Sequence, residues 1–132
     1  MEDIITAIIE NDFDLFVSLI NRNGYDSIDE DGFTVLMYCI QEDRFAMIDF
    51  LLTKDIEINK TNAVGNTALF YAVFNSKNKT EVIEKLLKKG ADMTIVNKSG
   101  VSPLSLANTM ANVNVKNFMN TWYHQKVYKN LS

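Results

Sequence analysis

The sequence predicts an all-α solenoid of about four helix–turn–helix units, and three observations lead to this prediction. Glycine-led segments recur at positions 32, 65 and 100, which are 33 and 35 residues apart. Apolar residues follow each glycine at the spacing of one helix face. The 132 residues contain only one proline and five glycines, which leaves long stretches open to helices. A period of this length is typical of folds whose units stack on one another.

The repeat divides the chain into units within one predicted domain, residues 1–132. The units run about over 1–28, 29–61, 62–96 and 97–132. Predicted helix pairs lie near 4–10 and 13–21, 34–41 and 45–53, 68–75 and 80–88, and 103–109 and 113–125. The first and last units match the repeat only in part. We therefore expect them to act as caps with a polar outer side.

Each complete unit has a predicted helix start and two apolar runs. Thr34, Thr67 and Ser102 suit helix N-caps, because a hydroxyl can accept a hydrogen bond from a free backbone N–H. Pro103 suits the first helical position, where its missing donor costs nothing. The predicted core residues are Leu36, Cys39, Ile40, Phe45, Ile48, Leu51, Leu52, Leu69, Ala72, Val73, Val82, Ile83, Leu86, Leu87, Leu104 and Ala107.

Two segments carry a resemblance to a known family. They are Gly65-Asn66-Thr67-Ala68-Leu69-Phe70-Tyr71-Ala72 at the start of a unit and Leu86-Leu87-Lys88-Lys89-Gly90-Ala91-Asp92 at its end. Both resemble the ankyrin repeat, and the resemblance covers roughly residues 2–119. It implies paired antiparallel helices with short hairpin turns, and protein binding through a concave side lined by the hairpin tips and first helices.

The chain departs from the family pattern in two places. The family's histidine near the start of the first helix is replaced by Met37, Phe70 and Ser105, so we expect its side-chain network to be absent. Two extra residues lie within 75–80, between the helices of the third unit. This inserted loop has two open interpretations, which are drift without function and a contact with a partner. Loop insertions fall on surfaces and cost little stability.

Carried over residue by residue, the resemblance implies a partner-binding surface. Its members are Glu10, Glu30, Asp31, Phe33, Gln41, Glu42, Asn66 and Phe74. Phe33 and Phe74 are either interface anchors or aromatic rings folded onto a neighbouring repeat. Tyr38 and Tyr71 lie one step from the groove, and we expect them to pack with solvated hydroxyls.

Charge divides the chain in two. Residues 1–57 contain 14 acidic and 3 basic side chains, whereas residues 58–132 contain 3 acidic and 10 basic ones. A linear stack keeps these halves apart, so we expect an acidic end that attracts a basic protein partner. The acidic runs can also be solvated turn residues. A competing interpretation places the interface at Lys77 and Lys79 of the inserted loop, with an acidic partner.

Little in the sequence indicates chemistry. His124 and Cys39 are the only histidine and cysteine, and we interpret them as a solvated residue and a core thiol; a reactive Cys39 is the alternative. We expect no enzyme, cofactor or metal site. The lysines of the basic half are not interleaved with aromatic residues, so nucleic acid is not an expected partner. An acidic N-terminus and the lack of an 18-residue apolar stretch predict a cytoplasmic protein without membrane spans.

These observations predict a non-catalytic, monomeric protein-interaction module. Its sharper form is an inhibitor of a basic partner, such as a nuclease-type toxin. The alternative is a regulatory subunit or host-directed effector of a larger assembly. Fold class alone does not decide between them.

Overall fold

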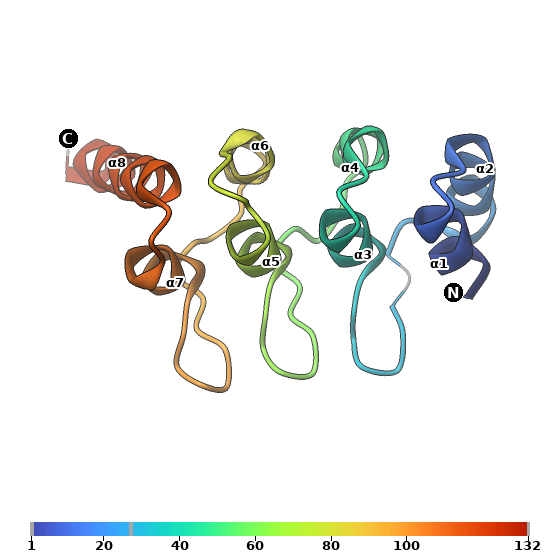
Figure 1. The fold of residues 1–132 in the computed structure, drawn as a ribbon, viewed down its shortest axis with the longest axis horizontal. Helices are drawn as coiled ribbons and strands as arrows, with labels where there is room; N and C mark the ends of the chain where they lie inside the picture. The colour runs from blue at the N-terminus through green and yellow to red at the C-terminus, as the bar shows by residue number, and fades with distance from the viewer. Residues whose placement is uncertain (1, 27, 132) are drawn as a thin grey trace.

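The computed structural model describes residues 2–26 and 28–131 as a row of four helix pairs (Figure 1). The helices are α1 (Glu2–Ile9), α2 (Phe13–Asn23), α3 (Val35–Gln41), α4 (Phe45–Leu52), α5 (Ala68–Phe74), α6 (Glu81–Lys88), α7 (Pro103–Thr109) and α8 (Val113–Leu131). The all-α solenoid is confirmed. Predicted and observed ends agree within two residues except at α8, which runs six residues past the predicted end at 125.

The stack has two rows of helices. The inner helices α1, α3, α5 and α7 contact one another in sequence order, and each also contacts the outer helix that follows it. Hairpins before α3, α5 and α7 project to one side of the stack (Figure 1). Below, units 1 to 4 denote the pairs α1–α2, α3–α4, α5–α6 and α7–α8, and units 2 to 4 include the hairpin that precedes their first helix.

The predicted N-caps begin the inner helices. Thr34, Thr67 and Ser102 accept hydrogen bonds from the backbone N–H three residues later, at 3.1, 3.3 and 3.1 Å. The predicted absence of the family's side-chain network near the helix start is wrong at Met37, whose sulfur accepts the Thr34 N–H at 3.5 Å, and at Ser105. The Ser105 hydroxyl oxygen accepts the Ser102 N–H at 2.9 Å, so the serine restores a reciprocal cap.

The core lies between the two rows of helices. Most of the predicted core residues are buried, including Leu36, Ile40, Leu69 and Leu86. Phe45 is an exception, because its side chain is 54% exposed at the first position of α4. The helical spacing of apolar residues placed Phe45 on the core face, but in the structure its side chain points largely into solvent.

The hairpins are linked to one another by backbone hydrogen bonds. Ala63 N–H donates to Asp31 O at 2.9 Å, and Lys98 N–H donates to Val64 O at 3.0 Å. The second turn approaches the third so closely that a Cβ atom on Gly65 would lie 3.0 Å from the Asn97 Cα. Gly65 also has a φ of 85°, so a side chain there would be strained on both counts.

Neighbouring units also cap each other's helices. Arg44 of unit 2 donates from Nε to Ile8 O at 2.6 Å and from Nη2 to Ile9 O at 2.8 Å. These carbonyls belong to the last turn of α1, which has no helical partner for them. Asn75 of unit 3 repeats the arrangement by donating to two carbonyls at the end of α3, at 3.1 and 3.2 Å.

Candidate partner-binding face

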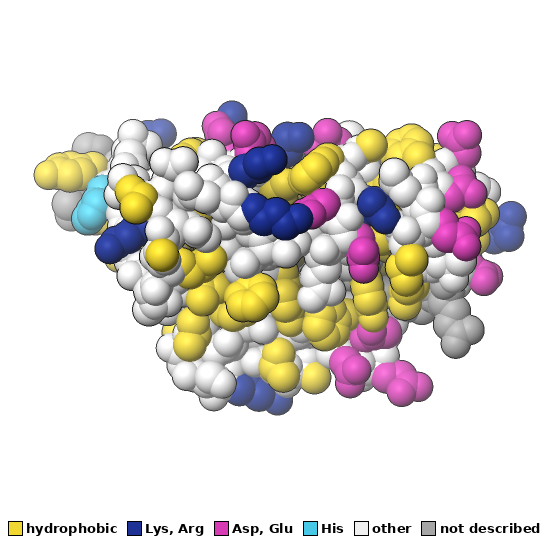
Figure 2. All heavy atoms as spheres, in the orientation of Figure 1, with side chains coloured by type: hydrophobic (Ala, Val, Ile, Leu, Met, Phe, Trp, Pro, Cys, Tyr) yellow, Lys and Arg dark blue, Asp and Glu magenta, His cyan; other side chains and the backbone are white. Residues whose placement is uncertain are grey.

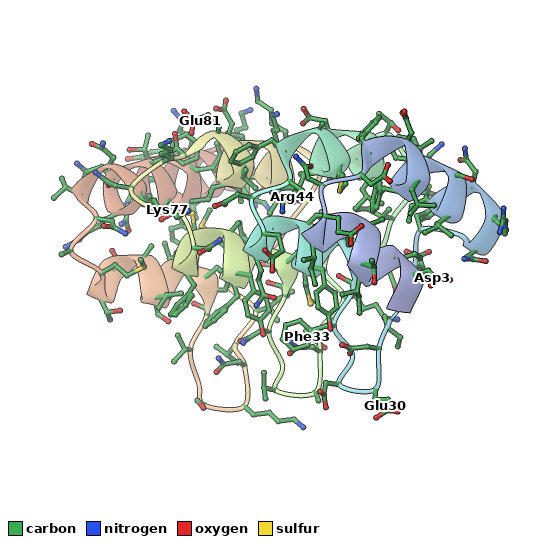
Figure 3. The ribbon with its side chains drawn as sticks, turned by 45° about the vertical axis from the view of Figure 1, so that its right-hand side comes forward. Asp3, Glu30, Phe33, Arg44, Lys77 and Glu81 are labelled. Carbon is green, nitrogen blue, oxygen red and sulfur yellow. The ribbon has the colours of Figure 1, made fainter. Side chains whose placement is uncertain are left out.

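The hairpins and the inner helices bound a common surface, which we call the inner face. It corresponds to the side that the repeat pattern implies as concave. Figure 3 places Glu30 at a hairpin tip and Phe33 between that tip and the helices. Figure 2 shows acidic side chains gathered toward the N-terminal end of the visible face and at one hairpin tip. The predicted binding residues therefore have to be located one by one on this surface.

Four of the predicted residues are exposed carboxylates. Glu30 and Asp31 lie in the first hairpin, Glu42 follows α3, and Glu10 follows α1. Within the described part of the chain, none of these four forms an ion pair. Gln41 is exposed beside Glu42 at the end of α3. Five predicted residues are thus exposed in units 1 and 2, and the four carboxylates among them have no ion pair within the described residues.

The two predicted aromatic residues behave differently. The Phe33 ring is half-buried, with its centroid 5.7 Å from the Tyr38 ring and 5.4 Å from the Tyr71 ring of the next unit. Of its two interpretations, the structure shows the ring folded onto a neighbouring repeat. Phe74 ends α5 with 65% of its side chain exposed, so it presents most of an aromatic ring to solvent.

Asn66 does not belong to the accessible surface, and its assignment needs correction. Its side chain is only 8% exposed. Its Nδ2 donates to the Tyr71 hydroxyl at 3.2 Å, and its Oδ1 accepts from Asn97 Nδ2 at 2.8 Å. Asn62 Nδ2 also donates to the Tyr71 hydroxyl, at 2.7 Å. Both polar ends of the Asn66 amide are therefore used inside the stack, and the expected solvated Tyr71 hydroxyl is instead held by two amides.

A recurring position that sequence reasoning missed organises the hairpins. Asp29, Asn62 and Asn97 each accept a backbone N–H from the residue four positions later, at 2.9, 3.0 and 3.0 Å. They are spaced by 33 and 35 residues, as the turn glycines are, so the repeat itself carried the signal. A short polar side chain at this position closes each turn.

Asp29 differs from its two counterparts because it is ionisable. The Tyr38 hydroxyl donates to its carboxylate, so the expected solvated hydroxyl of Tyr38 is wrong as well. This hydrogen bond, joined by N–H donors from Phe33 and Asp31, lowers the Asp29 pKa despite partial desolvation. The same contact and burial raise the pKa of Tyr38 to about 12. Asp29 therefore stabilises the turn as a carboxylate.

Cys39 and His124 show no features of a reactive site. The Cys39 side chain is fully buried, and burial raises the pKa of its thiol to about 12. The exposed His124 ring lies 5.9 Å from the Tyr123 ring. Among residues 2–26 and 28–131, no group of three or more His, Cys, Asp or Glu side chains is placed to hold a metal ion.

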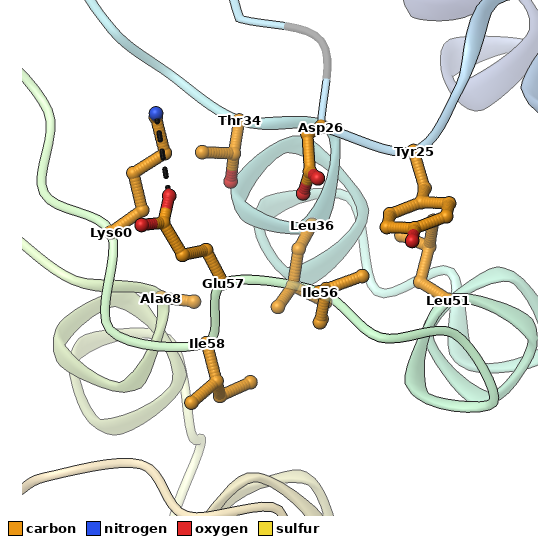
Figure 4. A pocket seen from close by; sticks show the side chains of 10 residues that line it. All are labelled: Tyr25, Asp26, Thr34, Leu36, Leu51, Ile56, Glu57, Ile58, Lys60 and Ala68. Carbon is orange, nitrogen blue, oxygen red and sulfur yellow. Dashed lines mark ion pairs between the residues drawn. The ribbon is translucent and has the colours of Figure 1, made fainter.

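A small cavity lies where the loop after α4 passes the start of the first hairpin. Tyr25, Leu36, Leu51 and Ile56 contribute to its lining, and Glu57 pairs with Lys60 at 3.6 Å across one edge (Figure 4). Its volume is about 20 Å³, which is space for a single water molecule. This cavity is a packing gap and offers no room for an organic ligand.

Comparison with known sequences decides the family. A profile described as ankyrin repeats, in three copies, matches residues 4–97. The chain belongs to the ankyrin-repeat family. Ankyrin repeats generally mediate protein–protein interaction, and the hairpin tip at Glu30 and Asp31 and the side chain of Phe74 are exposed to solvent. No helix of this ankyrin protein within the described ranges has the length and apolar character needed to cross a bilayer.

Individual relatives carry the same repeats in longer chains. A putative ankyrin repeat protein of Rickettsia bellii is 39% identical over 66 residues, which are 50% of this chain and 38% of that protein. One from fowlpox virus is 36% identical over 73% of this chain and 21% of its own length. Ankyrin repeat and SAM domain-containing protein 6 of Rattus norvegicus is 31% identical over 79% of this chain and 12% of its own. The chain thus spans well under half of each relative.

Proposed function

We propose that this ankyrin protein binds a basic protein partner through the acidic end of its inner face, at units 1 and 2. The observation that carries the proposal is the set of exposed carboxylates of Glu10, Glu30, Asp31 and Glu42, none of them ion-paired within the described residues. Unpaired like charges on one surface repel one another in the free protein. A basic partner relieves that repulsion, and long-range attraction speeds its approach.

The same face offers contacts that can hold a partner once it has arrived. Phe74 exposes most of its ring, and Gln41 lies exposed on the preceding inner helix with both donors and an acceptor in its side chain. Exposed aromatic residues are frequent energetic centres of interfaces. We therefore assign attraction to the carboxylates and retention to Phe74, with Phe33 contributing only the exposed part of its ring.

A partner that binds nucleic acid through a basic surface would be blocked by such a contact. The carboxylates would occupy the lysines and arginines that otherwise contact phosphates. The proposal therefore includes inhibition of a basic partner, such as a nuclease-type toxin, by a monomer of this chain acting in the cytoplasm.

Charge reversal tests the proposal. A partner is first captured by crosslinking to the intact chain, and its association and dissociation rates are then measured at several salt concentrations. Changing Glu30, Asp31 and Glu42 together to lysine should lower the association rate and flatten its salt dependence. Phe74→Ala should mainly raise the dissociation rate, with a loss of more than about 1 kcal/mol in binding.

Reversal at the other end of the charge distribution is the matched control. Lys77→Glu with Lys79→Glu reverses charge in the inserted loop, where the competing interpretation places the interface. Because Lys77 pairs with Asp43, the residue next to Glu42, this reversal should change the association rate, but much less than reversal at 30, 31 and 42. The proposal is wrong if reversal at 30, 31 and 42 has no effect while reversal at 77 and 79 abolishes binding.

A further inference from the structure

A pocket of about 450 Å³ lies between units 2 and 3, where the inserted loop joins α5 to α6. The buried side chains of Ile40 and Ala72 line it together with Val82 and the exposed ring of Phe45. Figure 2 shows hydrophobic atoms between basic side chains in the region over α4 and α6. A pocket of this size, apolar at its base and polar at its rim, fits the general form of a binding site.

The corresponding space one junction earlier is filled by the protein itself. There the Phe50 ring of α4 packs edge-on against Phe13 and Phe16 of unit 1, with centroids 6.3 Å away in both cases. The repeat alignment places Lys85 where Phe50 stands and Phe45 where Phe13 stands. The junction between units 2 and 3 therefore has the aromatic wall but lacks the ring that packs against it.

The Lys85 side chain does not replace that ring. Its ammonium group pairs with Asp49 at 2.6 Å, and 54% of the Phe45 side chain remains exposed, against 39% for Phe13. The exposed Phe45 ring and the pocket beside it thus accompany the exchange of an aromatic residue for a lysine in α6.

Two of the three lysines that line the pocket are balanced by ion pairs. Lys77 pairs with Asp43 at 2.6 Å, so that charge is balanced, as Lys85 is by Asp49. Glu81 is the first residue of α6, where the helix N-terminus stabilises a negative charge. Lys79 has no ion-pair partner among the described residues. A carboxylate of an occupant can therefore pair with the Lys79 ammonium group.

Residues of the inserted loop, among them Ser76, Lys77 and Lys79, form one wall of the pocket. Lys77 and Asn78 are consecutive left-handed residues, with φ of 52° and 63°, whereas the two preceding helix–helix turns have one such residue each, Asn11 and Asp43. The Ser76 hydroxyl lines the same pocket, and its buried oxygen has no hydrogen-bond partner in the described structure. Figure 3 places Lys77 and Glu81 away from the hairpin tip that carries Glu30, so this wall is separate from the acidic tip.

We propose that this pocket binds an aromatic side chain of a protein partner in which acidic residues flank the aromatic one. The ring takes the place that Phe50 has in the preceding junction and packs against Phe45 and Val82. A flanking carboxylate lies near the Lys79 ammonium. The site is independent of the binding of a basic partner by the inner face, because it uses the opposite charge and different residues.

The proposal can be tested by NMR with a defined probe and the full chain. The probe is an acetylated tripeptide amide of sequence Glu-Phe-Glu, titrated into ¹⁵N-labelled protein. We expect saturable shifts confined to the amides around Ser76, Lys79 and Val82. Replacing the probe's Phe by Ala, or both of its Glu by Lys, should weaken binding about tenfold or more, since each removes one of the two recognition features.

Two variants with a matched control complete the test. Lys85→Phe supplies the missing ring from the protein and should abolish probe binding, while Lys88→Phe, which breaks a comparable exposed ion pair outside the pocket, should not. Lys79→Glu should weaken probe binding while the amide spectrum away from the pocket stays unchanged. This second variant keeps the test decisive if Lys85→Phe does not fold. Reversal at Glu30, Asp31 and Glu42 should leave probe binding unchanged.

Several results would overturn the proposal. These are the lack of saturable shifts at the pocket, equal affinity in the Lys85→Phe variant, and equal affinity for the lysine-flanked probe. Equal binding of free 3-phenylpropionate and the tripeptide would also overturn it, because the pocket would then serve a small aromatic acid instead of a protein segment.

Discussion

Units 2 and 3 make corresponding contacts from corresponding positions, but with different chemistry. Unit 2 caps the end of α1 with the Arg44 guanidinium at 2.6 and 2.8 Å, and unit 3 caps the end of α3 with the neutral Asn75 amide at 3.1 and 3.2 Å. In the hairpins, Tyr38 donates to the Asp29 carboxylate, whereas the Tyr71 hydroxyl accepts from Asn62. Unit 2 therefore makes both contacts with a charged side chain, and unit 3 makes both with a neutral amide.

Because unit 2 uses charged side chains inside the stack, counting its charged residues in the sequence overstates the charge that a partner can contact. Arg44 and Asp29 are engaged inside the stack, so neither is part of the free surface charge. The carboxylates of this region that have no ion pair among the described residues include those at the hairpin tip and at the ends of the inner helices. Charge-assisted hydrogen bonds are also stronger and more dependent on pH than neutral ones, so the two units should respond differently to the same substitution.

The inner row of helices is where the two units should not differ. Leu69 of α5 is fully buried, and α5 contacts both α3 and α7. Leu69→Ala should therefore lower the free energy of unfolding by roughly 2–5 kcal/mol, since it leaves a cavity within the stack. Urea denaturation measures this, with the exposed His124→Ala as a control that should change stability very little. Equal small effects for both variants would contradict the shared inner core.

The outer row should separate the two junctions. Phe50→Ala removes a ring that contacts two aromatic neighbours and should cost roughly 1–3 kcal/mol, less than a fully buried phenylalanine because Phe50 is half-buried. Phe45→Ala should cost under about 1 kcal/mol, because 54% of its side chain is already in water. Denaturant midpoints of the two variants compare them directly. A larger loss for Phe45 would mean that its junction is packed as tightly as the earlier one.

The sequence predicted the architecture because the helix caps and the apolar residues recur at the same places in successive units. Thr34, Thr67 and Ser102 were found as caps since each stands at the same place in its unit and each has a hydroxyl to accept an N–H. The end of α8 could not be found in this way, because residues 126–131 follow the last repeat position and lack a counterpart in the earlier units. The side chains of residues 126–130 are exposed, so helix propensity contributes more to these last turns than burial of an apolar face does.

The candidate site was predicted less well than the fold. Glu10, Glu30, Asp31 and Glu42 are accessible, because turn and helix-end positions of charged residues rarely become buried. The prediction that Asn66 is accessible to a partner was wrong, because the sequence does not show whether an asparagine side chain faces solvent or a neighbouring turn. Only the three-dimensional stacking of hairpins, which sets Asn97 against Asn66, shows which way it bonds.

The last comparison concerns the tyrosines of the two hairpins, where the expected effects are small. Tyr38→Phe removes the hydrogen bond that is the main cause of the lowered Asp29 pKa, so that pKa should rise toward its ordinary value of 3.8. A lowered folded-state pKa contributes stability that is present above the unfolded pKa and lost as the pH falls through the folded value. At pH 7, Tyr38→Phe should therefore cost about 0.5–1.5 kcal/mol, and the difference from the unsubstituted chain should shrink as the solution is acidified below pH 4.

Tyr71→Phe provides the neutral comparison. Its hydroxyl accepts hydrogen bonds from the Asn62 and Asn66 amides, neither of which titrates, so its loss should cost a similar amount at pH 7 and at pH 3. Carboxyl ¹³C titration follows Asp29 directly, and urea midpoints at the two pH values give both stability differences. If the Tyr38 and Tyr71 variants depend on pH in the same way, the Asp29 carboxylate does not distinguish unit 2 from unit 3. If only the Tyr38 variant does, the charge in the first hairpin stabilises the fold itself, and the residues left to attract a partner are the unpaired ones at its tip.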